Sequence, residues 1–64
     1  MKWKVLEHHG SPELVAWTVW ERSECGRTIY ACTRDRNGQT VEPAGRGYDT
    51  VRKAVRLFLE NVEI

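Results

Sequence analysis

The chain has little of what usually reveals the function of a small domain. Its formal net charge is only +1, from ten Lys and Arg residues against nine Asp and Glu. The whole chain therefore lacks the strong positive charge that is typical of nucleic-acid-binding domains, and only an uneven distribution of charge would favour such a partner. Its longest apolar run is far shorter than the ~20 residues that span a bilayer, so we expect no membrane partner.

Cysteine and histidine are scarce, with two of each. Cys25 and Cys32 do not have the C-x₂₋₄-C spacing of a structural zinc site. In the expected hairpin, with a four-residue connection, Cys32 lies opposite Trp17 and Cys25 lies in the loop, too far away for a disulfide. His8 and His9 are neighbours in a strand and point to opposite faces, so they do not share a metal. Two free thiols and the lack of a signal peptide predict a cytoplasmic protein.

The sequence contains no recognisable catalytic arrangement. Cysteine and histidine are the residue types of a nucleophile and its base, but no pattern brings them together and no oxyanion-binding device accompanies them. The glycines around Arg46 do not form the phosphate-binding motif G-x-x-x-x-G-K-[ST], and we interpret them as residues that reverse the chain. We predict that the protein is not an enzyme and binds neither cofactor nor metal.

What the sequence does contain is a series of strands that ends in one helix. Alternating and β-branched residues predict strands over residues 2–8, 14–22 and 28–35. Asn37-Gly38 is typical of a type I′ turn and predicts a short returning strand over residues 39–42. Sixty-four residues allow a single domain, residues 1–64. The predicted fold class is α+β: an antiparallel meander of three or four strands with one C-terminal amphipathic helix packed on one face.

The predicted helix covers residues 49–62, with Asp49 or Thr50 as its N-cap. At about 100° per residue, one apolar stripe contains Tyr48, Val51, Val55, Phe58, Leu59 and Val62, with Ala54 at its edge. Leu57 projects away from this stripe. It is either a singly exposed leucine, which is common on protein surfaces, or a contact for a partner.

Both faces of the predicted sheet carry apolar side chains. The face that the helix covers is expected to carry Val15, Trp17, Val19 and Tyr30. Trp20 has the opposite parity and is expected on an open face, together with Thr18, Ile29 and Ala31. Because this open face is more apolar than a solvated sheet should be, we expect a homodimer that forms through it.

The charges of the predicted helix oppose its dipole. Arg52, Lys53 and Arg56 lie in its first two turns and glutamates lie in its last turn, whereas the dipole favours the reverse order. Together with Arg46, these residues concentrate positive charge at one end of the molecule. The cluster is either a solvated face or a patch for a nucleic-acid backbone or an acidic protein surface.

Residues 37–41 (NGQTV), then residues 47–50 (GYDT), then a helix that contains Ala54, resemble the YegP-like family of small bacterial domains. The resemblance covers about half of the chain. It implies a β-β-β-α unit in a dimeric or tandem arrangement, and no established activity. The chain departs from this family by its additional N-terminal strand and by residues 43–46 before the helix.

These observations favour a small non-enzymatic interaction module that binds itself or another protein; a phage or mobile-element regulator or inhibitor would fit this description. The expected partner-binding residues are Trp20, Arg22, Arg46, Arg52, Lys53, Arg56 and Leu57. The alternative is a β-β-β-α nucleic-acid-binding domain, with Trp20, Arg22 and Arg27 near a groove and the helix cations on phosphates.

Overall fold

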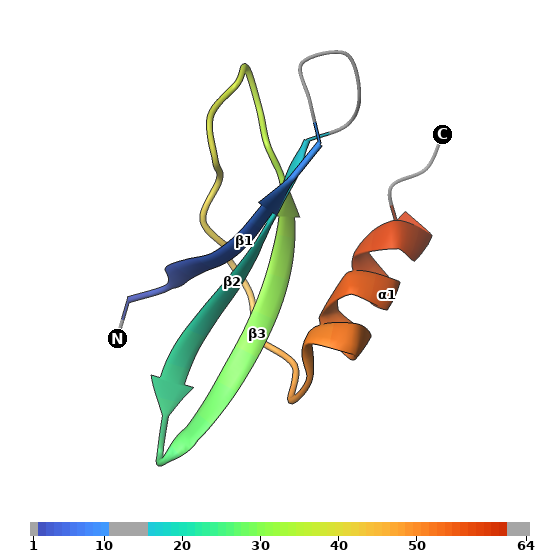
Figure 1. The fold of residues 1–64 in the computed structure, drawn as a ribbon. Coiled ribbons are helices and arrows are strands. Elements are labelled where there is room, and N and C mark those ends of the chain that lie inside the picture. Colours follow the sequence, from blue (N-terminus) through green and yellow to red (C-terminus); the bar gives the residue numbers. More distant parts are fainter. Residues whose placement is uncertain (1, 11–15, 62–64) are drawn as a thin grey trace.

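A computed structural model of the protein describes residues 2–10 and 16–61. Its elements are β1 (Lys4–His9), β2 (Trp17–Glu24), β3 (Arg27–Arg34) and α1 (Val51–Asn61). The strands form an antiparallel sheet in the order β1-β2-β3, and α1 packs on one side of it (Figure 1). The predicted α+β class is therefore confirmed, with three strands. The predicted core residue Val15 and the predicted helix residue Val62 lie outside the described residues.

The β2–β3 hairpin closes through a turn of two residues. Cys25 and Gly26 have φ angles of 52° and 77°, the positive values of a type I′ turn, and Glu24 pairs with Arg27. The expected four-residue connection is therefore wrong. A type I′ turn matches the right-handed twist of the flanking strands, so strand pairing continues further towards the turn.

A β-bulge interrupts β1 between Val5 and Glu7, and Leu6 is the extra residue. Lys4 and Glu7, on either side of the bulge, pair with two β2 residues that are two positions apart. Lys4 and Glu7 consequently lie on the same face of the sheet. Strict alternation over residues 2–8, which would put Val5 and Glu7 on one side, is wrong for this reason.

The face of the sheet under α1 carries the expected side chains. The rings of Trp17 and Phe58 lie 5.6 Å apart between centroids, and His9 stacks on Trp17 with centroids 4.3 Å apart. Val19 lies on the same face and is fully buried. The assignment of Trp17 and Val19 to the helix-covered face is therefore confirmed.

α1 packs through a stripe that is rotated from the predicted one. Ala54, expected at the edge of the stripe, is only 2% exposed, whereas Leu59, expected within it, is 57% exposed. Leu57, expected to project away, is half-buried. Leu59 follows Ala54 by five positions, so at about 100° per residue it points well away from a contact centred on Ala54.

The start of α1 is fixed at the edge of β3. The N–H of Tyr30 donates to the carbonyl of Tyr48 at 2.8 Å, and the N–H of Tyr48 donates to the carbonyl of Tyr30 at 2.7 Å. Two residues later, the hydroxyl of Thr50 accepts a hydrogen bond from the N–H of Lys53 at 3.1 Å. Thr50 is thus the N-cap, one of the two predicted positions.

The segment between β3 and α1 begins with the expected turn but does not return as a strand. Asn37 and Gly38 have φ angles of 51° and 76°, and Arg36 and Gln39 exchange backbone hydrogen bonds of 2.8 and 2.9 Å. The predicted strand over residues 39–42 is reduced to this single bridge. Beyond it the chain runs past the side of the sheet that faces away from α1 (Figure 1).

This linking segment, residues 39–47, covers the face that was expected to be open. Trp20 is only 6% exposed. Its indole N–H donates to the hydroxyl of Thr33 at 2.7 Å, and that hydroxyl donates to the carbonyl of Val41 at 2.5 Å. The expectation of an open face is therefore wrong, because the linking segment of the same chain covers it. The argument for a homodimer through that face no longer applies.

Gly47 lies at the other end of the linking segment, against the same face. A Cβ atom at this position would lie 3.0 Å from Cη2 of Trp3 and 3.1 Å from Cβ of Ile29. A side chain here would require these neighbours to shift by a few tenths of an ångström. The close approach explains why the chain has a glycine here, independently of any need for a positive φ angle.

Candidate functional site

The residues predicted to bind a partner do not form one surface. Trp20 is buried under the linking segment. The guanidinium carbon of Arg22 lies 4.8 Å from the ring centroid of Trp3, and its Nη2 lies 3.2 Å from a carboxylate oxygen of Glu24. Trp20 and Arg22 are therefore both engaged within the chain. The exposed members of the predicted set are Arg46 in the linking segment and Arg52, Lys53 and Arg56 on α1, whereas Leu57 is half-buried.

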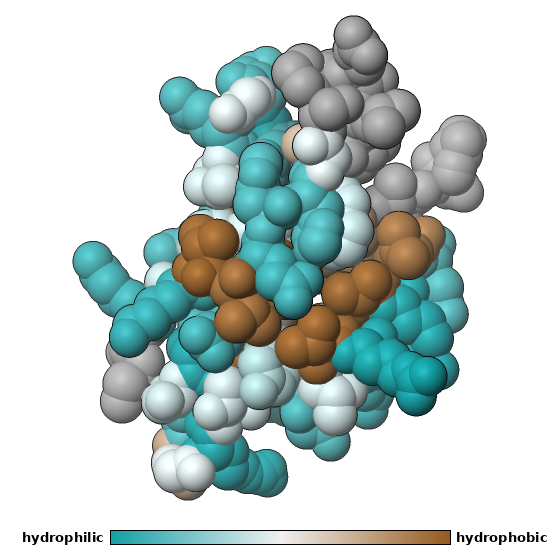
Figure 2. Space-filling model, viewed as in Figure 1, coloured by the Kyte–Doolittle hydropathy of each residue, from teal (hydrophilic) through white to brown (hydrophobic). Residues whose placement is uncertain are grey.

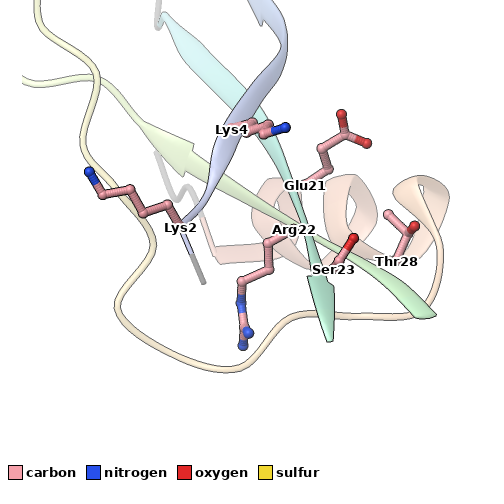
Figure 3. Close-up of a pocket in the computed structure, with 6 residues that line it drawn as sticks. All are labelled: Lys2, Lys4, Glu21, Arg22, Ser23 and Thr28. Carbon is pink, nitrogen blue, oxygen red and sulfur yellow. The ribbon is translucent and has the colours of Figure 1, made fainter. Parts of the chain in front are cut away.

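A hollow of about 380 Å³ lies beside Arg22, at the end of the sheet where β1 begins. Its lining residues are Lys2, Lys4, Glu21, Arg22, Ser23 and Thr28. Figure 3 shows the side chains of Lys4 and Glu21 extending to one side, while those of Lys2 and Arg22 extend in other directions. The three cationic groups do not converge on a point, so the hollow does not have the geometry of an anion site.

The outward side of α1 is basic. Arg52, Lys53 and Arg56 are all exposed, and the first turn of the helix contains no acidic residue. Among the described residues, none of these three cations forms an ion pair within 4.0 Å. Arg46, in the linking segment, is also exposed. The charge distribution that opposes the helix dipole is thus present on an accessible surface.

An exposed leucine adjoins these cations. Leu59 follows Arg56 by three residues, and side chains three or four apart lie next to each other on a helix. Figure 2 shows apolar side chains along α1 bordered by hydrophilic ones. We call the set of Arg52, Lys53, Arg56 and Leu59 the helix surface. The predicted apolar stripe of the helix included Leu59 and so placed it in the core. Its spacing of three residues from Arg56 was the one signal in the sequence that could have placed it beside the cations.

A second accessible apolar surface lies on β1. All six residues of the strand are exposed; Val5 is 52% exposed and Leu6 is 38% exposed. Figure 2 shows apolar side chains over this strand. The alternation in the sequence predicted a half-buried strand here, whereas β1 is exposed along its whole length. Its composition of Lys, Glu and His around two apolar residues is, however, typical of an edge strand.

A histidine–carboxylate pair joins β1 to the end of β3. Nε2 of His8 lies 2.7 Å from one carboxylate oxygen of Asp35, and the hydroxyl of Thr18 donates to the other at 3.0 Å. Thr18 is fully buried and its hydroxyl is bonded to Asp35 rather than to His8. The geometry is therefore that of a structural network that holds three strands together, and not that of a nucleophile with its base.

The two cysteines are free and differ in environment. Cys25 is exposed in the hairpin turn, whereas Cys32 lies in β3 opposite Val19, rather than opposite Trp17 as expected. Burial raises the pKa of the Cys32 thiol to about 12, so this thiol is a poor nucleophile at neutral pH. Within residues 2–10 and 16–61, no three or more His, Cys, Asp or Glu side chains are grouped so as to hold a metal ion.

No helix in the described part of the chain has the length and apolar character needed to cross a membrane. No family model matches the chain, and no curated protein or solved structure matches it.

Proposed function

We propose that this protein is a small non-enzymatic interaction module that binds an acidic surface of another protein through the helix surface. The observation that carries the proposal is the combination of three exposed cations, without ion pairs among the described residues, and an adjacent leucine that is 57% exposed. Folding does not need either feature. Both are disfavoured on an isolated chain, since the cations oppose the helix dipole and Leu59 exposes apolar area to water.

The two features have different roles in such a contact. Leu59 provides an apolar side chain that loses contact with water when a partner covers it, which contributes to affinity. Arg52, Lys53 and Arg56, which precede it on the helix, provide long cationic side chains that steer an acidic partner towards the helix and fix its orientation. A buried apolar centre with a polar rim is the usual composition of a protein–protein interface.

A protein partner is favoured over nucleic acid by the positions of Trp20 and Arg22. A β-β-β-α nucleic-acid binder would present these residues near a groove, but Trp20 is 6% exposed and Arg22 stacks on Trp3. A cytoplasmic location is in keeping with the exposed free thiol of Cys25.

The test is to recover the partner from native cells with the immobilised chain and then to measure the affinity with both proteins purified. We expect charge reversal at Arg52 and Arg56, and separately Leu59→Ser, to weaken binding by about tenfold or more, since 1.4 kcal/mol corresponds to that factor. Arg36→Glu is the matched control, because this exposed arginine lies in the Asn37-Gly38 turn and should leave the affinity unchanged.

Two results would contradict the proposal. One is a partner whose affinity is insensitive to the helix-surface variants. The other is binding to duplex or single-stranded nucleic acid that weakens log-linearly with salt and loses part of its salt dependence when Arg52 and Arg56 are replaced, as expected for phosphate contacts.

A further inference from the structure

β1 is an edge strand whose outer side is unpaired in the part of the chain that the structure describes. It pairs with β2 on one side only, and Figure 1 shows it at the front of the sheet. An edge of this kind presents a row of backbone N–H and C=O groups that another strand can pair with. Val5 and Leu6, at the centre of β1, are among the most exposed large apolar side chains of the described residues.

The bulge gives this edge a charge pattern that a second copy can complement. Because Leu6 is the extra residue, Lys4 and Glu7 lie on the same face although they are three positions apart. In an antiparallel pair of two β1 strands, related by a two-fold axis through the Val5–Leu6 bulge, Lys4 of each copy lies opposite Glu7 of the other. Two attractive cross-strand pairs form, both on the face that carries α1.

The same pattern disfavours the neighbouring registers. Sliding one strand by one same-face position moves the two-fold axis onto Lys4 or onto Glu7. This sets Lys4 opposite Lys4 of the other copy, or Glu7 opposite Glu7, and like charges directly opposite each other are destabilising. Bulges and charges protect many edge strands from pairing. On β1 they act selectively, because the opposite signs attract a second copy in one register and repel it in the two neighbouring registers.

We propose that two copies of this chain pair along β1 in this register and form a continuous six-stranded sheet. The two-fold axis is perpendicular to the sheet, so both α1 helices lie on the same side of it. The proposal does not depend on the helix surface, which belongs to a different element. One pair of six-residue strands is a small interface, so we expect a weak dimer, with a dissociation constant on the order of micromolar or higher.

Sedimentation velocity of the full chain over a wide concentration range tests the proposal. We expect a reversible monomer–dimer equilibrium, and we expect Glu7→Lys to weaken it by about tenfold or more, because both attractive pairs become repulsive. Lys4→Glu should act in the same direction. The double variant, Lys4→Glu with Glu7→Lys, exchanges the charges across the two-fold axis and should restore dimerisation to within about threefold of the original. Leu59→Ser, on α1, should not change it.

A second measurement guards against variants that disturb the fold. Glu7 lies 2.8 Å from His9, and Lys4 has Glu21 as its neighbour on β2, so each variant is first checked by circular dichroism. In the unmodified chain, hydrogen exchange of the β1 amides should slow as the protein concentration rises, with no such change in β3. A monomer at all concentrations, a dimer that tolerates both single reversals, a charge exchange without recovery, or concentration-dependent protection outside β1 would each overturn the proposal.

Discussion

The cover over the Trp20 face can be tested with a single methyl group. Gly47→Ala would place a Cβ atom 3.0 Å from Cη2 of Trp3 and 3.1 Å from Cβ of Ile29. Contacts this short force one of the groups to move. Cβ of Ile29 is attached to the backbone of β3, and the ring of Trp3 lies against the Arg22 guanidinium, so neither group yields easily. Overpacking of this kind costs about 1–3 kcal/mol.

Gly45→Ala is the matched control. A Cβ atom at Gly45 meets no atom within 4 Å, and neither Gly45 nor Gly47 has a φ angle in the left-handed region. Both substitutions reduce the conformational entropy of the unfolded chain equally, which raises the free energy of unfolding by about 0.4–1 kcal/mol in each case. This contribution therefore cancels in the comparison. Gly47→Ala should consequently be less stable than Gly45→Ala by about 1–3 kcal/mol.

Urea unfolding followed by tryptophan fluorescence and circular dichroism measures this difference. A 64-residue domain is expected to have a free energy of unfolding of about 3–10 kcal/mol, so the loss is a large fraction of the total. In thermal unfolding, each kcal/mol should lower Tm by about 4–8 °C. If Gly47→Ala proves as stable as Gly45→Ala, the linking segment does not pack on Trp3 and Ile29, and the reasoning for a covered face fails.

Three further predictions concern single side chains. Thr33→Val should destabilise the protein by about 1–3 kcal/mol, because the buried indole N–H of Trp20 loses its acceptor, and Thr33→Ser should recover most of the loss in chemical denaturation. Thr50→Ala should cost about 1 kcal/mol through loss of the helix N-cap, with Thr50→Ser near the original stability; equal stability of all three chains would contradict the assignment. With an aromatic disulfide reagent at pH 8, Cys25 should react promptly. Cys32, whose pKa burial raises to about 12, is almost entirely protonated and should react fully only after unfolding; two thiols reacting at one rate in the folded protein would refute this.

The elements with strong local signals were predictable from the sequence. The β2 and β3 strands, the Asn37-Gly38 turn and the helix follow from residue alternation, from turn chemistry and from helical periodicity. Side-chain parity also placed Trp17 and Trp20 on opposite faces correctly, because an antiparallel strand leaves no other choice.

The path of the linking segment was not predictable in this way. Residues 40–47 have no periodicity, and a few long-range contacts hold them in place, such as the hydrogen bond from Thr33 to Val41. The bulge at Leu6 and the rotated stripe of α1 were not predictable either. Residue alternation does not show where an extra residue interrupts strand pairing, and hydropathy alone does not show that Ala54, being small, is preferred at the helix contact.

The candidate site was predictable in part. The basic half of α1 was visible from the sequence, because the positions of charged residues relative to the helix ends can be read directly. The exposure of Leu59 and the engagement of Arg22 by Trp3 were not, since both depend on the angle at which elements pack.

The mutual hydrogen bonds of Tyr30 and Tyr48 make the two edges of the sheet unequal. They occupy the middle of the outer side of β3, so a foreign strand can be added at β1 but not along the whole of β3. Two chains joined at β1 would have only obstructed edges left, and growth would stop at that point. Such a dimer would leave no exposed, partly apolar strand for open-ended polymerisation into fibrils.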